Sequence, residues 1–210
     1  MNITYKKDKN GDEILIRNDD TYLSNQIMME WEKPYMEALV ERLNPFGNVL
    51  EIGFGLGYSA NAIQKYDINM HTIIETDFFI QEQVALWGKE QKHKVNIIGG
   101  AWQKELATLQ QNYDSIFFDD YPLPNHEWVD GVLVKVHDSD PDNSRIFDFY
   151  DQLIEHSLVN PGARFTFFCS EKSEQWSGKV SWKEYEMTIP KNVDYLGNEG
   201  ELYLPLITFK

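Results

Sequence analysis

Asn48-Val-Leu-Glu-Ile-Gly-Phe-Gly-Leu-Gly57 is the part of the sequence from which the architecture is most readily inferred. A short apolar run, typical of a buried strand, leads into three closely spaced glycines, and a helical pattern follows to about Lys65. Glycines let the backbone turn sharply and let a ligand approach the main chain, while the N-terminus of the following helix offers unpaired N–H groups. The stretch therefore predicts a ligand-binding loop between a strand and a helix.

The same alternation of apolar run and helical pattern continues beyond this loop. The five runs cover residues 48–52, 70–74, 95–98, 115–118 and 164–169. Alternation of this kind builds a parallel sheet that is covered by helices on both faces. Two final runs, 180–189 and 201–209, are separated only by a turn-rich segment and predict an antiparallel pair. The predicted class is α/β, with a seven-stranded, mostly parallel sheet and an antiparallel C-terminal edge.

The segments outside this alternation carry weaker signals. Two alternating runs flank Asn10-Gly11, a dipeptide that favours tight turns, and predict an N-terminal β-hairpin. From about Ser24 to Leu43, apolar residues recur at spacings of three and four and predict one helix. The stretch 127–148 shows no sustained period, so we expect a polar, solvated insertion there.

Charge and composition exclude several classes of function. The chain has 210 residues, with 19 Lys and Arg against 34 Asp and Glu, and a formal net charge of −15. Such a charge repels nucleic acid and anionic lipid. No apolar stretch resembles a signal peptide or a membrane span, and the single Cys169 allows no internal disulfide. We expect a cytoplasmic protein with no nucleic-acid partner, no membrane partner and a small cationic ligand.

Two residues near the glycine loop indicate which ligand it binds. A dinucleotide site would need a small residue where this chain has Tyr58. Glu75 ends the second run, where an acidic side chain can accept hydrogen bonds from both ribose hydroxyls. The pattern favours a ligand that contains adenosine. The alternative is an ordinary turn beside a surface carboxylate. The five histidines show no metal-ligand spacing, so we expect no metal.

Two further carboxylates suggest the substrate chemistry. Asp119 ends the fourth run, where side chains at the carboxyl edge of a parallel sheet point into the ligand crevice. Glu32 lies on the predicted N-terminal helix. Two carboxylates can hold a planar cation and accept one of its protons. Taken singly, Glu32 fits a solvated helix residue and Asp119 fits a helix cap or a turn residue.

Several of these motifs together resemble a known family. The run from Val49 to Gly57, followed by Glu75, is similar to motif I and the next acidic residue of class I S-adenosylmethionine-dependent methyltransferases. Met29-Glu-Trp-Glu-Lys-Pro-Tyr-Met36 and Phe118-Asp-Asp-Tyr-Pro-Leu123 resemble the guanidinoacetate N-methyltransferase family and relatives that methylate the δ nitrogen of protein arginine. The resemblance implies a Rossmann-like class I methyltransferase fold in one domain, 1–210. Residues 1–46 would cover the site and residues 47–210 would form the cofactor-binding core.

The resemblance also assigns expected roles. It implies an N-methyltransferase that uses S-adenosylmethionine as its cofactor and releases S-adenosylhomocysteine. Glu32 would bind the guanidino group, and Asp119 would orient it and take a proton. The implied cofactor site consists of Met36, Gly53, Phe54, Gly55, Glu75, Ala101, Trp102 and Asp119. The implied substrate site consists of Glu32, Trp31, Tyr121, Pro122, Ser170 and Glu171.

The partner implied by the resemblance is a small guanidino compound or an arginine-containing peptide, and the chain is expected to form a homodimer. Guanidinoacetate enzymes have CNLTSW where this chain has Cys169-Ser-Glu-Lys-Ser-Glu-Gln-Trp176, so the substrate itself stays open. Two alternatives remain. One is a methyltransferase of another amine or a hydroxyl, and the other is a non-catalytic module that binds S-adenosylmethionine.

Overall fold

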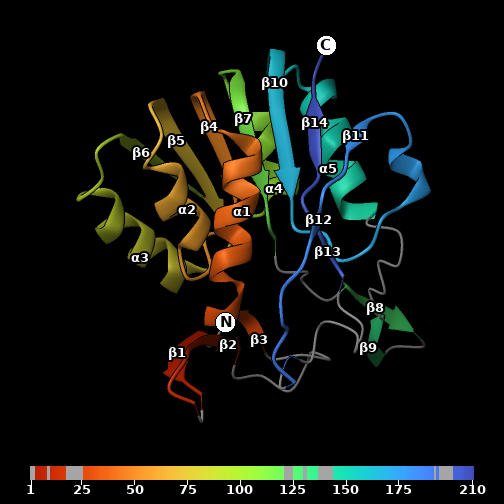
Figure 1. Cartoon of the computed structure of the whole chain (residues 1–210). Helices are drawn as coiled ribbons and strands as arrows, with labels where there is room; N and C mark the ends of the chain where they lie inside the picture. The colour runs from red at the N-terminus through yellow and green to blue at the C-terminus, as the bar shows by residue number, and fades with distance from the viewer. Residues whose placement is uncertain are drawn as a thin grey trace.

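A seven-stranded sheet forms the centre of the protein, in the order β11-β14-β10-β7-β4-β5-β6 (Figure 1). The computed structural model describes residues 3–8, 10–17, 26–120, 145–191, 193 and 201–210, together with the backbone of 125–129, 132–136 and 144. The strands are β4 (Gly47–Ile52), β5 (Ile68–Glu75), β6 (Lys94–Gly99), β7 (Tyr113–Phe118), β10 (Val159–Phe167), β11 (Val180–Ser181) and β14 (Leu206–Thr208).

Strand pairing confirms the predicted mostly parallel sheet with an antiparallel edge. The five strands from β10 to β6 pair in parallel. β14 is antiparallel to β10, and β11 is antiparallel to β14. The predicted final pair is divided, because β12 (Glu184–Tyr185) and β13 (Leu202–Tyr203) form a separate ladder. Pro205, which has no N–H to donate, separates β13 from β14.

Helices cover both faces of the sheet. The α-helices are α1 (Lys33–Leu43), α2 (Tyr58–Ile63), α3 (Phe78–Gly88), α4 (Trp102–Glu105) and α5 (Ser144–Glu155), and the 3-10 helices are η1 (Glu30–Glu32), η2 (Leu106–Thr108) and η3 (Glu174–Trp176). Side chains of β4 alternate between two cores: Val49 packs with α1, α2 and α3, and Leu50 packs with α4 and α5. No helix in the described part of the chain is long and apolar enough to cross a membrane.

The N-terminal segment departs from the prediction of one helix from Ser24 to Leu43. The expected hairpin is present as β1 (Ile3–Lys7) and β2 (Glu13–Arg17), but residues Gln26–Met29 form a third strand, β3, beside β2. The helical prediction was therefore wrong before η1, and α1 begins only at Lys33. Pro34 favours a helix start, since proline suits the first turn and not the interior.

The stretch 127–148 contains more regular structure than expected. β8 (Asn125–Val129) and β9 (Val132–Val136) form an antiparallel hairpin, and α5 begins at Ser144. Ile146, Phe149 and Leu153 of α5 recur at spacings of three and four and are buried against the sheet. The prediction of an irregular insertion was wrong for these parts.

Tyr35 ties α1 to the far end of the chain. Its buried hydroxyl donates to the carbonyl of Tyr203 at 2.6 Å and accepts from the Cys169 N–H at 3.1 Å. The ring also packs edge-on against Phe168, with centroids 5.4 Å apart. One side chain thus joins α1, β13 and the carboxyl end of β10. Cys169 is itself buried, as the sequence predicted.

Replacing Tyr35 with phenylalanine tests this connection. Tyr35→Phe leaves the buried Cys169 N–H and Tyr203 carbonyl without this hydroxyl, so we expect a loss of about 1–3 kcal/mol in the free energy of unfolding. Urea unfolding followed by circular dichroism measures it. Tyr185→Phe is the control, because that hydroxyl donates to Pro34 O at 3.1 Å in an exposed position and its loss should cost about 0.5 kcal/mol. Equal losses in both variants would contradict the assignment.

Candidate active site

The order of the central strands reverses between β4 and β7. From β4 the chain proceeds to β5 and β6 on one side, and from β7 it proceeds to β10 on the other. Ligands of open α/β sheets bind at such a reversal of strand order. The Asp119 N–H donates to Ile52 O at 3.1 Å and the Gly53 N–H donates to Ile74 O at 3.0 Å. The residues that follow both strands are therefore fixed beside each other.

Gly53 is required by a close backbone approach at this point. Its φ is +80°, and a Cβ atom built there would overlap the carbonyl oxygen of Asp119. A side chain would force β4 and β7 apart where the crevice opens. The carbonyl oxygen of Asp119 thus explains why the turn predicted from the sequence has a glycine at this position.

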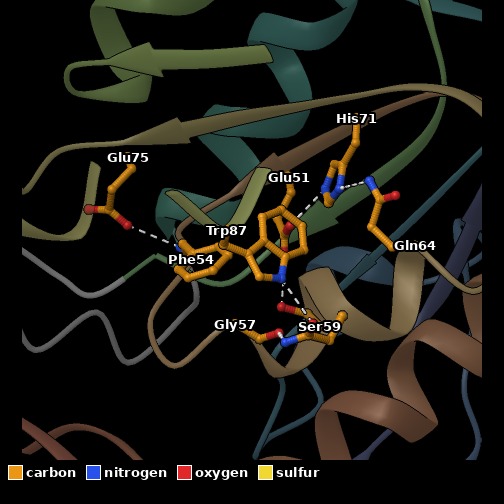
Figure 2. Close-up of polar contacts among 9 residues, drawn as sticks. Glu51, Phe54, Gly57, Ser59, Gln64, His71, Glu75 and Trp87 are labelled. Atoms are coloured by element: carbon orange, nitrogen blue, oxygen red, sulfur yellow. Dashed lines mark hydrogen bonds and ion pairs between the residues drawn. The ribbon is translucent and has the colours of Figure 1, made fainter. Parts of the chain in front are cut away.

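Glu75 is fixed at the end of β5 beside the glycine loop. Its Oε2 accepts from the Phe54 N–H at 3.0 Å (Figure 2), and its Oε1 accepts from the Asp77 N–H at 2.9 Å. Burial raises the pKa of Glu75, and these backbone hydrogen bonds partly offset the shift. The Gly100 N–H donates to the carbonyl of Glu75 at 3.0 Å, which brings the segment containing Ala101 to the same place. The expected ribose and adenine neighbours therefore lie together.

The N-terminal sheet lies on the glycine loop. The Tyr5 hydroxyl donates to Gly55 O at 3.3 Å, and the Leu56 N–H points at Met28 Sδ at 3.2 Å. Figure 1 shows this sheet at the end of the molecule toward which the central strands run. Tyr5 was not recognised from the sequence, because the only signal was one aromatic residue in a polar hairpin strand. The contact places β1 and β3 over the loop expected to hold the cofactor.

The charges of Glu32 and Asp119 both affect the pKa of the buried Tyr35 hydroxyl. Glu32 is only 3 % exposed, so the reading of a solvated helix residue was wrong, and its Oε1 accepts from the Met29 N–H at 2.7 Å. Burial raises the pKa of Tyr35 well above its usual range, and the charges of Asp119 and Glu32 raise it further. The two carboxylates predicted to bind the substrate thus both lie within electrostatic range of Tyr35.

Asp119 has the proton affinity of a base that works near neutral pH. Burial raises its pKa to about 7; the negative charges of Asp120 and Glu51 add to the shift, and Arg145 opposes it. Solvent reaches part of the residue, although protein atoms surround most of it. An ordinary aspartate is ionised at neutral pH and accepts protons weakly. Asp119 is the stronger base.

Asp120 links two elements next to this base. The Trp102 Nε1–H donates to Asp120 Oδ2 at 2.8 Å, and Arg145 Nη2 lies 3.1 Å from Asp120 Oδ1. α4 and α5 are thereby held at the carboxyl end of β7. Neither Asp120 nor Arg145 was singled out from the sequence, because their pairing depends on a contact across 25 positions in the chain.

The remaining predicted site residues are less uniform in their placement. Met36, a residue of α1, is fully buried in the core. Trp31 is partly buried and packs against the same core. Ser170 and Glu171 follow β10 and are exposed. Tyr121 and Pro122 lie outside the described residues. The ring of Trp176 stacks on the ring of Phe147, with centroids 3.8 Å apart, and so packs against α5. Among the residues described, no group of three or more His, Cys, Asp or Glu side chains could hold a metal ion.

Comparison with protein families identifies the chain. Residues 13–140 match the family model described as guanidinoacetate N-methyltransferase. The chain belongs to the guanidinoacetate N-methyltransferase family. The matched range contains β2 to β9, and so includes Glu32, the glycine loop, Glu75 and Asp119.

Several curated proteins similar to this chain are named protein arginine N-methyltransferase 2. Protein arginine N-methyltransferase 2 of Saccharomyces cerevisiae is 25 % identical over 183 residues, which cover 75 % of this chain and 44 % of that protein. The protein of the same name from Candida glabrata is 30 % identical over 151 residues, covering 68 % of this chain and 32 % of the relative. The chain therefore spans less than half the length of these two relatives.

Solved structures show the same fold at low identity. Spermidine synthase from Thermotoga maritima superposes with a TM-score of 0.57 and 14 % identity, over 98 % of this chain and 72 % of that one. An O-methyltransferase from Bacillus cereus, solved with SAH, gives a TM-score of 0.54 and 13 % identity, over 85 % and 80 % of the two chains. The Rossmann-like class I methyltransferase fold predicted from the sequence is confirmed.

Substitution of Gly53 tests the close approach of β4 and β7. Gly53→Ala adds backbone strain and a clash with Asp119, and we expect it to lower the free energy of unfolding by about 3 kcal/mol or more. Gly178→Ala is the matched control, since Gly178 has a φ of +74° with no atom within 4 Å of the added Cβ. Its cost should be about 1–2 kcal/mol, from strain alone. Equal decreases in the denaturant midpoints of the two variants would contradict the contact between Gly53 and Asp119.

The raised pKa of Asp119 makes a pH-dependent prediction for stability. The folded protein keeps a proton on Asp119 up to a pH of about 7, whereas an ordinary aspartate loses it near 3.8. Between these values the folded state binds more protons than the unfolded state, so the contribution of Asp119 to stability falls as pH rises. Asp119→Asn should therefore raise the melting temperature more at pH 8 than at pH 4. A pH-independent difference between wild type and variant would contradict this ionisation.

Proposed function

We propose that this chain is an N-methyltransferase that moves a methyl group from S-adenosylmethionine to a guanidino nitrogen of a small molecule or an arginine residue. One observation carries the proposal: in a member of this family, Asp119 follows β7 at the point where the strand order reverses and has a pKa raised to about 7, while Glu32 is a second buried carboxylate. Family membership supports the cofactor, and the two carboxylates support a cationic, proton-donating substrate.

Several described residues fit an adenosine-containing cofactor. The backbone at Gly53 leaves no room for a side chain, because a Cβ atom there would overlap the carbonyl oxygen of Asp119. Glu75 would hold the ribose hydroxyls, Gly53, Phe54 and Gly55 would line the loop, and Ala101 and Trp102 would lie beside the adenine. When bound, S-adenosylmethionine supplies a methyl group on a positively charged sulfur.

Glu32 and Asp119 would convert a guanidinium into a nucleophile. A guanidinium has a pKa above 12, so its nitrogens attack poorly while the proton and the delocalised charge remain. Glu32, fixed by the Met29 N–H, would hold the group in one orientation. Asp119 would take the proton as the nitrogen forms its new bond to carbon. Alignment of nitrogen and methyl group would supply most of the rate.

The surroundings support an arginine residue among the substrates. The two curated relatives reported above are both named protein arginine N-methyltransferase. Lys172, the cation that follows β10, lies 3.3 Å from Glu184 and 4.4 Å from the ring of Tyr203. It is already paired, and so is a poor anchor for the carboxylate of guanidinoacetate. A peptide arginine carries no such carboxylate.

Other expectations from the sequence stay predictions. We propose a single domain over 1–210, a homodimer, no nucleic-acid or membrane partner, and a cytoplasmic location. The net charge of −15 supports the absence of polyanionic partners. The contacts of Tyr5 and Met28 with the glycine loop support one domain, because residues 1–46 then contribute to the same site.

Turnover of guanidines tests the proposal. Release of S-adenosylhomocysteine should be measured with guanidinoacetate, arginine, agmatine and arginine peptides. We expect turnover with at least one guanidine, and Asp119→Asn should lower kcat by about 10²–10⁴, because the amide accepts no proton. For the unaltered protein, kcat/KM should rise with pH up to about 7, as Asp119 loses its proton.

Controls separate this proposal from the alternatives. Asp67→Asn alters an exposed carboxylate between α2 and β5 and should leave turnover unchanged. Turnover of amines or alcohols with no guanidine accepted would favour the other methyltransferase reading. Cofactor binding with no product from any substrate would favour a binding module. Undiminished turnover in Asp119→Asn would remove Asp119 from the mechanism.

A further inference from the structure

Asp120 has no part in the mechanism above, although it directly follows Asp119 in the chain. Its Oδ2 accepts from the Trp102 Nε1–H of α4 at 2.8 Å. Its Oδ1 lies 3.1 Å from Arg145 Nη2 of α5 and forms an ion pair with it. The side chains of Asp120 and Arg145 are only 13 % and 25 % exposed, so solvent screens this pair less than it screens a surface pair. One carboxylate thus joins α4 and α5 beside the proposed base.

Arg145 occupies a place on α5 that does not favour a cation. It is the second residue of a helix that begins at Ser144, and the helix dipole makes a positive charge unfavourable in the first turn. The helix cannot rotate to move this charge away, because Ile146 and Phe149 are buried in the core. Asp120 therefore supplies a negative charge where the fold fixes a positive one.

Trp102 is held by the other oxygen of Asp120. The indole is 3 % exposed, and its N–H is the only polar group of the ring, so it needs an acceptor inside the protein. The Gly100 N–H donates to Glu75 O at 3.0 Å. The segment 100–102 is thus held at both ends, by Glu75 and by Asp120. This is the segment expected to lie beside the adenine.

The charges of this ion pair reach Asp119. The ionisable groups around Asp119 are Asp120, Glu51 on β4, Arg145 on α5, and Tyr35 on α1, on which Glu32 also acts. Burial is the largest cause of the raised pKa of Asp119; the negative charge of Asp120 raises it further, and Arg145 lowers it. Tyr35 adds no charge, because burial raises its own pKa well above its usual range. Asp120 and Arg145 therefore act on the base in opposite directions.

We propose that Asp120 is a positioning residue with two separable roles: its Oδ2 fixes the segment 100–102 through Trp102, and its charge, balanced by Arg145, sets the electrostatic surroundings of Asp119. These roles rest on the proposed function, because they concern the cofactor and the base of that reaction. Asp120 then connects the wall expected beside the adenine with the group expected to take the proton. The roles separate because the first needs only a hydrogen-bond acceptor, whereas the second needs a charge.

Replacing Asp120 with asparagine removes the charge and keeps an acceptor. The amide oxygen of Asp120→Asn can still accept from the Trp102 N–H. Calorimetric titration of S-adenosylmethionine into the full chain should therefore give the wild-type affinity. The loss of a negative neighbour lowers the pKa of Asp119, so the rise of kcat/KM with pH should move to lower pH by about one pH unit. The profile is measured with the guanidine that the unaltered protein turns over fastest.

Arg145→Gln should have the opposite effect on the pH profile. A positive neighbour is lost, so the rise of kcat/KM should move to higher pH by about one pH unit. Asp120→Asn combined with Arg145→Gln should lie close to the wild-type profile, because one charge of each sign is removed. Asp148→Asn is the matched control. It removes an exposed carboxylate from the same helix, where solvent screens the charge, and should leave the profile in place.

Asp120→Leu tests the role of the acceptor. Leucine has a similar size but no acceptor, so the buried Trp102 N–H loses its partner. The affinity for S-adenosylmethionine should fall about tenfold in Asp120→Leu, in contrast to Asp120→Asn. Trp102→Phe keeps an aromatic ring without the N–H. It should also weaken binding of S-adenosylmethionine, but it should leave the pH profile in place because no charge changes.

Each outcome decides one role. If Asp120 only stabilises the fold, both Asp120 variants lower stability and the pH profile stays in place, which would overturn the charge role. Shifts in the same direction in Asp120→Asn and Arg145→Gln would also overturn it. Equal affinities for S-adenosylmethionine in Asp120→Asn and Asp120→Leu would overturn the acceptor role, and Trp102→Phe decides this role if Asp120→Leu does not fold.

Failure of the proposed function gives a different result. An unaltered protein that turns over no guanidine would overturn the proposed function and the charge role of Asp120 with it. Turnover by the unaltered protein, together with variants whose pH profile and cofactor affinity do not change, would overturn only the two roles of Asp120.

Discussion

The close approach of β4 and β7 at their carboxyl ends is the constraint from which the candidate site follows. The Asp119 N–H bonds to Ile52 O, and the carbonyl of Asp119 occupies the space that a side chain at position 53 would need. Strand register and the glycine loop are therefore set by one contact. Because the strand order reverses here, Asp119 and the loop that ends at Gly57 meet at the same point, where open α/β sheets bind ligands.

The buried carboxylates near this point differ in their surroundings. Glu75 accepts from backbone N–H groups, and Glu51 accepts from Ser59, so both are fixed by donors. Asp119 is governed instead by burial and by its negative neighbours, which leave it ready to take a proton. A carboxylate that is held only to stabilise the fold would be a weak base. The cost in stability at Asp119 is consistent with a role in chemistry.

Much of the architecture could be predicted from the sequence, because it depends on local pattern. Alternating apolar runs and glycines identified the central sheet, its edge and the loop, and the ends of the runs identified Glu75 and Asp119. The failures depend on distant contacts. Gln26–Met29 became a strand because β2 offers it a partner, and the same spacing also fits a helix. The pairings of Tyr5 with Gly55, Asp120 with Arg145 and Glu51 with His71 join segments whose neighbours the sequence does not show.

The hydrogen bond of Tyr35 has a consequence for how the protein is made. Tyr35 and Tyr203 are 168 positions apart, and the helix that follows Glu32 is anchored through this contact. During synthesis α1 can form early, but its final anchor is not available until residue 203 has left the ribosome. Contacts of such high sequence separation form late and slow folding. The anchor of α1 is therefore completed only after the hydrogen bonds of Tyr5 with Gly55 and of Phe54 with Glu75, whose partners all lie within the first 75 residues.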